Sequence, residues 1–260
     1  MAFMTSPADE YTLRVRPRFH VPGVTSTSER VELPEDEAEH LVRVLRLGVG
    51  DEVDIFDGRG GLWRAEVVQV GKKTATVRRL EPGRPASELG VMLTLVVSVL
   101  KGDKMDDVVR DAVMLGVAGI RPVLSDRSEI GMAAMARSSR IARWQRIAVS
   151  SAKQCGRAVV PSIHEAVPLD SYWKDKVAGL RIMCVEPASA LGEVVGVQAV
   201  RKPAAADVII GPEGGWAVPE VVAAHDSGAI LMSLGGRTFR ADAVPIVAVT
   251  ALLTTWGELK

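Results

Sequence analysis

The sequence predicts an α/β protein in two parts, a small β-rich module followed by a larger domain with a parallel sheet covered by helices. Residues 51–80 alternate apolar and polar side chains over three short segments, which is typical of an antiparallel meander. From Val91 onward, apolar strand-like runs alternate with helical patterns, as in a parallel sheet. Residues 81–90 hold two prolines and two glycines and form the expected linker. We therefore expect domains at 1–83 and 84–260.

The individual elements follow from local signals. A helix over 33–47 has acids in its first turn and arginines towards its end, which complement the helix dipole. The larger domain is expected to have strands at 91–100, 119–125, 181–187, 206–212 and 229–235, and helices at 103–116, 139–155, from about 219, and at 243–256. The last helix is apolar on nearly all sides, so it must be buried, either inside its own domain or in a homodimer interface.

Composition limits the classes of protein that this chain can belong to. Its 260 residues are 47% hydrophobic and 25% charged, which is ordinary for a globular protein. No apolar run is long enough to span a bilayer, and the start lacks the pattern of a secretory signal. The two cysteines lie far apart, form no metal-ligand spacing and suit a reducing compartment. We expect a cytoplasmic protein without a metal ion or a membrane partner.

Charge is unevenly distributed although the formal net charge is zero. The segment from Arg137 to Arg157 contains six basic residues and no acid. Such a stretch is either a solvated helix face or a surface for nucleic acid, and charge alone does not decide between the two.

Two glycine-rich loops follow expected strands near the C-terminus, "GPEGG" at 211–215 and "LGGRTFR" at 234–240. In open α/β sheets, ligands bind beyond the carboxyl ends of the strands, and glycine lets a ligand approach the backbone. A third strand ends in "CVEP" at 184–187, so a shared pocket is expected. Neither loop has a P-loop lysine or the GxGxxG fingerprint. A neutral, adenine-containing ligand such as S-adenosylmethionine suits backbone donors and acceptors of this kind.

The two loops also carry a family resemblance. "IIGPEGGW…PE" and "LGGRTFRADAV" before an apolar helix resemble the SPOUT superfamily of RNA methyltransferases. Within it, the chain resembles the RsmE family, which methylates N3 of a uridine in 16S ribosomal RNA. Further matches are "HLVRVLRLGVGD…DG" from His40, "KGDKMDDVVRDAVMLGV" from Lys101, "SDRSEI", and "RWQRIAVSSAKQCGRAVVP" from Arg143. The resemblance covers nearly the whole chain.

The resemblance implies a fold, a cofactor and partners. It implies an N-terminal PUA-like β-barrel, a C-terminal SPOUT domain with a trefoil knot, S-adenosylmethionine as cofactor, a homodimer formed by the C-terminal domain, and 16S rRNA, within the 30S subunit, as substrate. The cofactor residues it implies are Glu186, Pro187, Ile210, Gly211, Pro212, Glu213, Gly214, Gly215, Leu234, Gly235, Gly236, Arg237 and Phe239. Glu213 could equally serve as a structural hydrogen-bond partner.

Two residues are candidates for the chemistry. Deprotonated uracil carries negative charge on its carbonyl oxygens, which Arg240 could stabilise, while Asp242 orients the arginine or accepts the proton. The family commonly reads L-R-x-E-T-A where this chain has Phe239–Ala243, so the acid is shortened to Asp242 and the threonine is replaced by Ala243. Asp242 could instead cap the last helix, or Arg240 could only pair with Asp242 across a dimer.

The basic residues are candidates for phosphate contacts, which position RNA without reading its sequence. The candidates, with one amide that could face the target nucleotide, are Arg43, Arg46, Lys101, Lys104, Arg143, Arg146, Lys153, Gln154 and Arg157. Two other functions remain open: a SPOUT enzyme with another target, such as a ribose 2′-oxygen, and a non-catalytic RNA-binding protein of the same fold.

Overall fold

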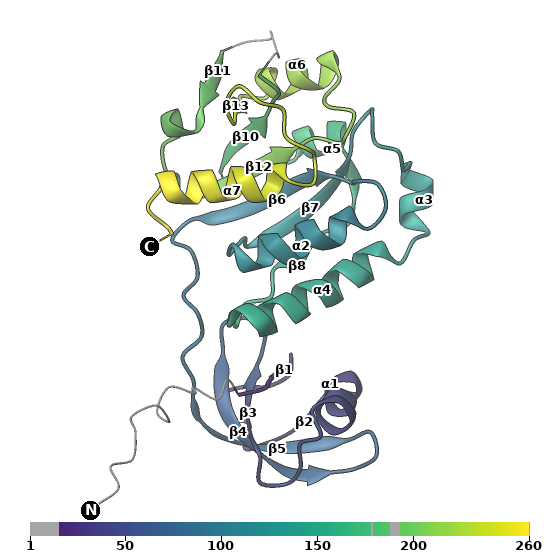
Figure 1. Ribbon diagram of the computed structural model, residues 1–260, viewed down its shortest axis with the longest axis vertical. Helices are drawn as coiled ribbons and strands as arrows, with labels where there is room; N and C mark the ends of the chain where they lie inside the picture. Colours follow the sequence, from purple (N-terminus) through teal and green to yellow (C-terminus); the bar gives the residue numbers. More distant parts are fainter. Residues whose placement is uncertain (1–15, 178, 188–192, 260) are drawn as a thin grey trace, which may run out of the picture. The chain divides into compact units, whose positions relative to one another are not determined.

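The structure, a computed structural model, describes residues 16–177, 179–187 and 193–259. The chain divides into two compact units, Met1–Pro85 and Ala86–Lys260, and the proline- and glycine-rich segment 81–90 spans the division. In the described part, no helix combines the length and the apolar character that crossing a membrane requires. Each unit has its own sheet (Figure 1).

The first unit contains a five-stranded sheet in the order β1-β3-β4-β5-β2. Its centre is the predicted meander, with antiparallel pairing of β3 (Glu52–Phe56), β4 (Leu62–Val70) and β5 (Ala75–Pro82). β1 (Arg18–His20) extends it in parallel beside β3, and β2 (Arg30–Glu32) runs antiparallel to β5. Among the described residues β1 and β2 form the two edges and do not pair, so the sheet is open where a closed barrel was expected.

The helix of the first unit changes geometry half-way. The single helix predicted over 33–47 begins as α1 (Glu35–Glu39) and continues as the π-helix η2 (His40–Val44). The Leu45 N–H donates to the His40 carbonyl at 3.0 Å, an i→i−5 bond that widens the turn. Arg46 then has φ 55°, the left-handed conformation that commonly ends helices. Ala38 and Leu41 are fully buried and anchor the helix to the core of this unit.

The second unit is built on a sheet with the order β11-β13-β10-β12-β6-β7-β8, and β9 pairs with β7. Every strand pair in it is parallel, as the alternating pattern predicted. The strands are β6 (Met92–Ser98), β7 (Gly119–Leu124), β8 (Ser162–Ile163), β9 (Val167–Pro168), β10 (Leu180–Cys184), β11 (Val194–Gly196), β12 (Ala205–Ile210) and β13 (Ile230–Ser233).

Helices cover both faces of this sheet. α2 (Lys104–Met114), α4 (Arg140–Cys155) and α7 (Val244–Thr255) lie in front of the strands in Figure 1. α5 (Leu169–Lys174) and α6 (Val218–Asp226) pack on the alternate strand residues, where Tyr172 and Val221 join Val96 and Ile209 in one buried cluster. The short α3 (Met132–Ala136) and the 3₁₀ turn η3 (Val197–Ala199) lie in the connections.

Arg157 is part of this core. It is 4% exposed, its Nε donates to Glu88 at 3.0 Å, and its Nη1 donates to the carbonyls of Val113 and Val117 at 2.8 and 3.1 Å. The side chain therefore ties the chain after α4 to the end of α2 and to the segment before β6. Burial with these partners leaves no donor facing solvent for a phosphate, so the RNA contact predicted for Arg157 is wrong and its role is structural.

Candidate functional site

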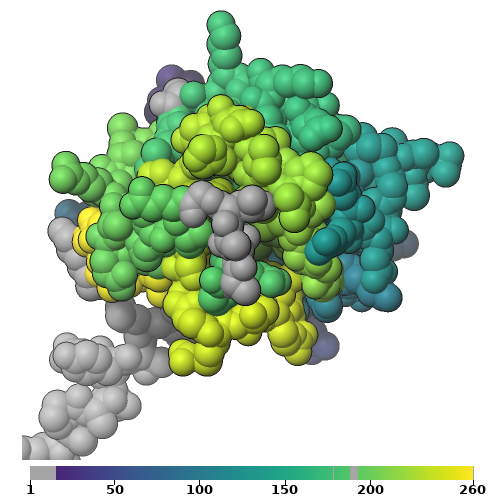
Figure 2. Space-filling view, turned by 90° about the horizontal axis from the view of Figure 1, so that it is seen from above, coloured from purple at the N-terminus to yellow at the C-terminus, as the bar shows by residue number. Residues whose placement is uncertain are grey.

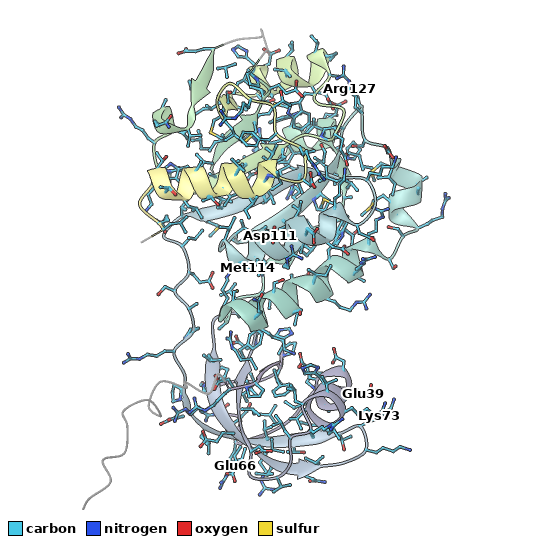
Figure 3. The ribbon with its side chains drawn as sticks, in the orientation of Figure 1. Glu39, Glu66, Lys73, Asp111, Met114 and Arg127 are labelled. Atoms are coloured by element: carbon cyan, nitrogen blue, oxygen red, sulfur yellow. The ribbon has the colours of Figure 1, made fainter. Side chains whose placement is uncertain are left out.

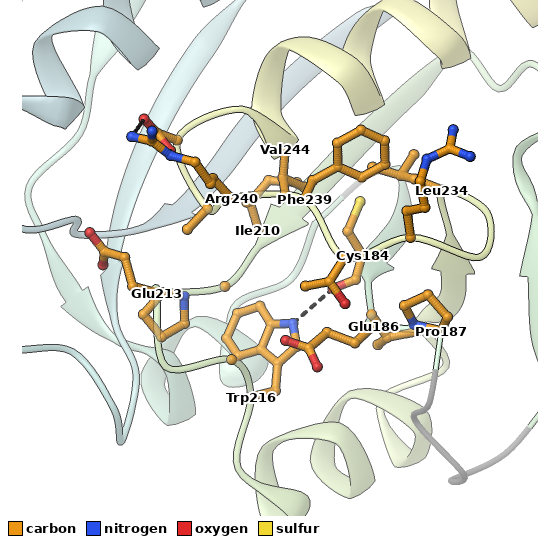
Figure 4. Close-up of a pocket in the computed structure, with 18 of the residues that line it drawn as sticks. Cys184, Glu186, Pro187, Ile210, Glu213, Trp216, Leu234, Phe239, Arg240 and Val244 are labelled. Carbon is orange, nitrogen blue, oxygen red and sulfur yellow. Dashed lines mark hydrogen bonds and ion pairs between the residues drawn. The ribbon is translucent and has the colours of Figure 1, made fainter.

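A cavity of about 240 Å³ lies where three neighbouring strands of the second unit end (Figure 4). β13, β10 and β12 are adjacent and parallel, so the loops that follow them meet at one edge of the sheet. The residues lining the cavity are Lys104, Cys184, Val185, Glu186, Pro187, Ile210, Gly211, Pro212, Glu213, Gly215, Trp216, Leu234, Arg237, Thr238, Phe239, Arg240, Ala241, Asp242 and Val244.

Most of the predicted pocket residues line this cavity, together with both candidates for the chemistry. The exceptions are Gly214, Gly235 and Gly236, which belong to the same loops but do not line it. Lys104, predicted for RNA, does line it. Cys184, Val185 and Thr238 belong to the segments from which the pocket was expected but were not singled out, and sequence reasoning missed Trp216, Ala241 and Val244.

Trp216 is the most informative of the missed residues. Its Nε1 donates to the Cys184 carbonyl at 2.8 Å, which ties the loop after β12 to the end of β10 (Figure 4). A Cβ built on Gly211 would lie 2.9 Å from Cε2 of this ring. Gly211 is therefore a glycine because the indole packs against its backbone, a reason that differs from the ligand contact inferred from sequence. The sequence signal that could have identified Trp216 is an aromatic residue directly after a glycine-rich loop.

Gly214 and Gly215 are explained by two neighbouring side chains. Arg127, labelled in Figure 3, lies over Gly214, where a Cβ would approach the Arg127 Cβ to 3.1 Å, and its Nη1 donates to the Gly214 carbonyl at 2.7 Å. Gly215 has φ +69°, and a Cβ there would meet Oε1 of Glu186 at 3.1 Å. The loop thus needs glycine at both positions to admit Arg127 on one side and the Glu186 carboxylate on the other.

Glu220 forms hydrogen bonds that fix the end of the same loop. It is 5% exposed, and its two oxygens accept hydrogen bonds from the Asp126 N–H at 2.9 Å and the Ala217 N–H at 2.8 Å. The first bond crosses to the loop after β7, and the second closes the first turn of α6. A buried carboxylate with two backbone donors fixes both loops relative to each other.

Arg240 and Asp242 form an ion pair within one chain. Arg240 Nε donates to Oδ1 at 3.1 Å and Nη2 to Oδ2 at 2.8 Å. Partial burial alone would raise the pKa of Asp242, but these hydrogen bonds and the charge of Arg240 outweigh it and lower the pKa. α7 begins after Ala243 without a side-chain cap, so the capping role considered for Asp242 is wrong: its carboxylate is turned towards the arginine.

Glu213 connects the cavity to the loop after β6. Its Oε1 accepts from Lys104 Nζ at 2.7 Å and from the Lys101 N–H at 3.2 Å. Burial would raise the pKa of this carboxyl, but the lysine and the backbone donor lower it. Seen from above, the yellow-green atoms of the loops after β12 and β13 lie beside the teal atoms of residues 100–140 (Figure 2). Glu213 is thus both a pocket residue and a hydrogen-bond partner.

The remaining predicted RNA residues differ in how free their side chains are. Lys101 pairs with Glu129 at 3.1 Å, Arg143 pairs with Asp103 at 3.3 Å and also with Asp106, and Arg43 pairs with Glu39. Arg46, Arg146 and Gln154 are exposed, and Lys153 is half-buried. Within the basic stretch at 137–157, Arg143 is therefore paired with acids of another element and Arg157 is buried with Glu88, whereas Arg146 stays exposed.

Comparisons with known proteins agree with this architecture. An RNA methyltransferase domain model matches residues 87–253, and an RNA methyltransferase PUA domain model matches residues 33–80. A ribosomal RNA small subunit methyltransferase E of Synechocystis is 32% identical over 226 residues, 85% of this chain and 72% of that protein. The chain belongs to the ribosomal RNA small subunit methyltransferase E family.

Solved members of this family, or proteins like them, share the whole fold. A ribosomal RNA small subunit methyltransferase E from Neisseria gonorrhoeae, bound to S-adenosylmethionine, is similar with TM-score 0.83 and 29% identity over 93% of this chain and 98% of that one. A Legionella pneumophila methyltransferase in complex with S-adenosylmethionine has TM-score 0.82 and 25% identity over the same shares. The α/β fold predicted from sequence, with its PUA-like and SPOUT-type parts, is confirmed.

The packing of Trp216 gives a testable difference between two glycines. Gly211→Ala should lower the free energy of unfolding by about 1–3 kcal/mol, because the new methyl group forces the indole out of its place. Gly236→Ala is the matched control, since a Cβ there meets nothing within 4 Å, and it should change stability by less than about 0.5 kcal/mol. Urea denaturation measures both; equal stabilities would contradict the account of Gly211.

Proposed function

We propose that this protein transfers a methyl group from S-adenosylmethionine to N3 of a specific uridine in 16S ribosomal RNA, within the 30S subunit and in the cytoplasm. The observation that carries the proposal is the cavity at the carboxyl ends of β10, β12 and β13, in a chain of this family, with Arg240 on its wall. Relatives of the same fold hold S-adenosylmethionine.

The residues around the cavity fit this cofactor. Ile210, Leu234 and Phe239 offer apolar surface for an adenine ring, and the loop backbone that lines the cavity after β12 carries amides and carbonyls for its polar edges. The Glu186 carboxylate beside Gly215 suits ribose hydroxyls. These residues would hold the cofactor, which supplies an electrophilic methyl group when it is bound.

The reaction requires a uracil N3 that has lost its proton and whose negative charge is stabilised. The Arg240 guanidinium carries a fixed positive charge at the wall of the cavity, and its side chain is 77% exposed, within reach of an incoming base. Because the pKa of Asp242 is lowered, this carboxylate is a weak base at neutral pH. We assign it the role of positioning Arg240, whose charge favours the ionised uracil, and the N3 proton passes to a base of the solvent, such as hydroxide or buffer, before methyl transfer.

Basic side chains on both units would position the RNA. Arg43 and Arg46 lie at the end of the helical segment in the first unit, and Lys101, Lys104, Arg146 and Lys153 belong to the second, with Gln154 at the end of α4. Contacts from such groups to phosphates supply affinity that weakens with salt. Base selection then depends on the cavity, because phosphate contacts carry no sequence information.

A homodimer is supported by α7. Within the chain this helix buries Ala248, Val249, Leu252 and Leu253, but Ile246 remains 40% exposed. A second cavity of about 450 Å³ is lined by α7 residues from Val247 to Thr255 and by 196–198 and 233–235. Leu234 lines both cavities, so a second copy seated here adjoins the cofactor pocket. A predominantly apolar helix with one side uncovered is the expected form of an interface helix.

Methyl transfer to ribosomal substrates tests the proposed function. With labelled S-adenosylmethionine, the protein should label 30S subunits from cells lacking this modification more strongly than naked 16S rRNA. Reverse transcription should then stop at one uridine, because N3 methylation blocks base pairing. Labelling without a stop would indicate ribose methylation, and binding without labelling would indicate a non-catalytic RNA-binding protein.

Arg240→Ala should lower kcat by a factor of about 10²–10³, since a charge opposite the developing uracil anion is lost. Cofactor affinity, measured by calorimetry, should change little, and Arg240→Lys should not restore the rate because the bidentate pairing with Asp242 is lost. Arg237→Ala in the same loop serves as the comparison and should act mainly on KM for the cofactor. Normal turnover of Arg240→Ala would remove Arg240 from the mechanism.

The oligomeric state tests the role of α7. Val247→Glu places a charge on the half-buried face of the helix and should convert the dimer to a monomer in light scattering. Val222→Glu, on α6, introduces the same charge at a residue that is 41% exposed and should leave the dimer intact. A wild-type monomer, or a Val247→Glu dimer, would contradict the assignment of this face.

A further inference from the structure

Three ion pairs stand together at the mouth of the cofactor cavity. Lys101 pairs with Glu129, Lys104 with Glu213, and Arg240 with Asp242, at 3.1, 2.7 and 2.8 Å. Lys104, Glu213, Arg240 and Asp242 all line the cavity, and the charge of Lys104 reaches Asp242. Lys104 and Arg240 at the cavity, and Lys101 beside it, thus each have a carboxylate partner before an RNA arrives.

The central pair is the most enclosed of the three. The side chains of Lys104 and Glu213 are 35% and 33% exposed, against 66% and 60% for Lys101 and Glu129. Arg240 is 77% exposed. Glu213 Oε1 also accepts from the Lys101 N–H, so one carboxylate oxygen receives a charged donor and a backbone donor at once. This is the donor arrangement that binds an anionic oxygen of any kind.

A phosphate oxygen of RNA has the same requirements as that carboxylate oxygen. The Lys104 ammonium has three N–H donors and no acceptor, and it acts on an oxygen anion as a compact point charge. A phosphate can reach Lys104 only if Glu213 leaves it or shares it. The exchange is feasible because a partly exposed ion pair contributes only about 0.2–1 kcal/mol, which a polyanion overcomes.

We propose that Glu213 occupies the position of an RNA phosphate at Lys104 and so acts as a specificity-determining residue that weakens the binding of RNA to the cavity mouth. A phosphate that approaches Lys104 must compete with the carboxylate for the lysine, so phosphate contacts alone hold a substrate less tightly. An RNA whose uracil also enters the cavity gains contacts that offset the displacement. This inference rests on the proposed function, because it assigns RNA as the anion that approaches the mouth.

The test is RNA binding by Glu213→Gln, with oligouridylate as the probe and no cofactor present. Removing the carboxylate charge frees Lys104, so affinity should rise about two- to fivefold at low salt. The plot of log K against log salt should become steeper by about 0.7, the value for one more phosphate contact by a single strand. In a Lys104→Met background, Glu213→Gln should have no effect.

Controls separate this effect from a general change in charge. Asp226→Asn removes the same charge at the C-terminal end of α6, outside the cavity lining, and should leave affinity and salt slope unchanged. Glu213→Ala should tighten binding like Glu213→Gln, so that misfolding of one variant does not decide the result. Calorimetry with S-adenosylmethionine shows whether each variant keeps its cofactor pocket.

Two results would overturn the inference. One is unchanged RNA affinity in Glu213→Gln and Glu213→Ala; the other is an equal gain in Asp226→Asn, which would indicate a non-local charge effect. The methyl-transfer assay reports separately on the proposed function. If the wild-type protein methylates 30S subunits but Lys104→Met binds RNA with normal affinity, the proposed function stands and the role given to Glu213 is wrong.

Discussion

The site depends on the parallel pairing of three central strands. β12 pairs with β10 on one side and β6 on the other, and the register brings Ile209 level with Met183 and with Val96. All three residues are fully buried, so at this level of the strands no side chain faces a ligand. The last residues of β10 and β12, Cys184 and Ile210, do line the cavity. What the strands fix is where their loops begin. Because parallel strands end at the same edge, the loops that carry Lys101, Glu186 and Glu213 start side by side.

The parallel strands set where the loops begin but not their conformation. Three side-chain hydrogen bonds to other segments fix that conformation. Trp216 bonds the end of β10, Glu220 bonds the loop after β7, and Arg127 bonds the backbone of Gly214. Each joins the loop after β12 to a segment far away in the sequence. Glycines in this loop are required by those neighbours. The pocket is therefore held in shape by protein contacts before any ligand arrives, which is the condition for precise binding through backbone groups.

These facts explain which features the sequence could predict. Long apolar runs such as β6 and β12 have a clear pattern, whereas β8, β9 and β11 have only two or three residues and no readable period. The pocket loops were predicted from strand ends and glycines. The roles of Trp216, Glu220 and Arg157 depend on partners 32, 94 and 69 residues away, which no local pattern encodes. A capping role was considered for Asp242 from its position, beside the pairing with Arg240, and the arginine takes the carboxylate. The prediction that S-adenosylmethionine is the cofactor depended on the family resemblance.

The formal net charge of the chain is zero, and in the structure several basic side chains are paired with acids. A basic stretch suggested an exposed positive surface, yet Arg143 is paired with Asp103 and Asp106, and Arg157 is buried with Glu88. Near the cavity, Lys104 and Arg240 are likewise paired with acids. An acid beside each of these cations weakens their attraction for a polyanion at long range. In the proposed exchange at Lys104, an RNA phosphate replaces one ion pair by another at short range, where the exact position of each phosphate matters. On that proposal, recognition depends on shape and on the cavity more than on attraction at a distance.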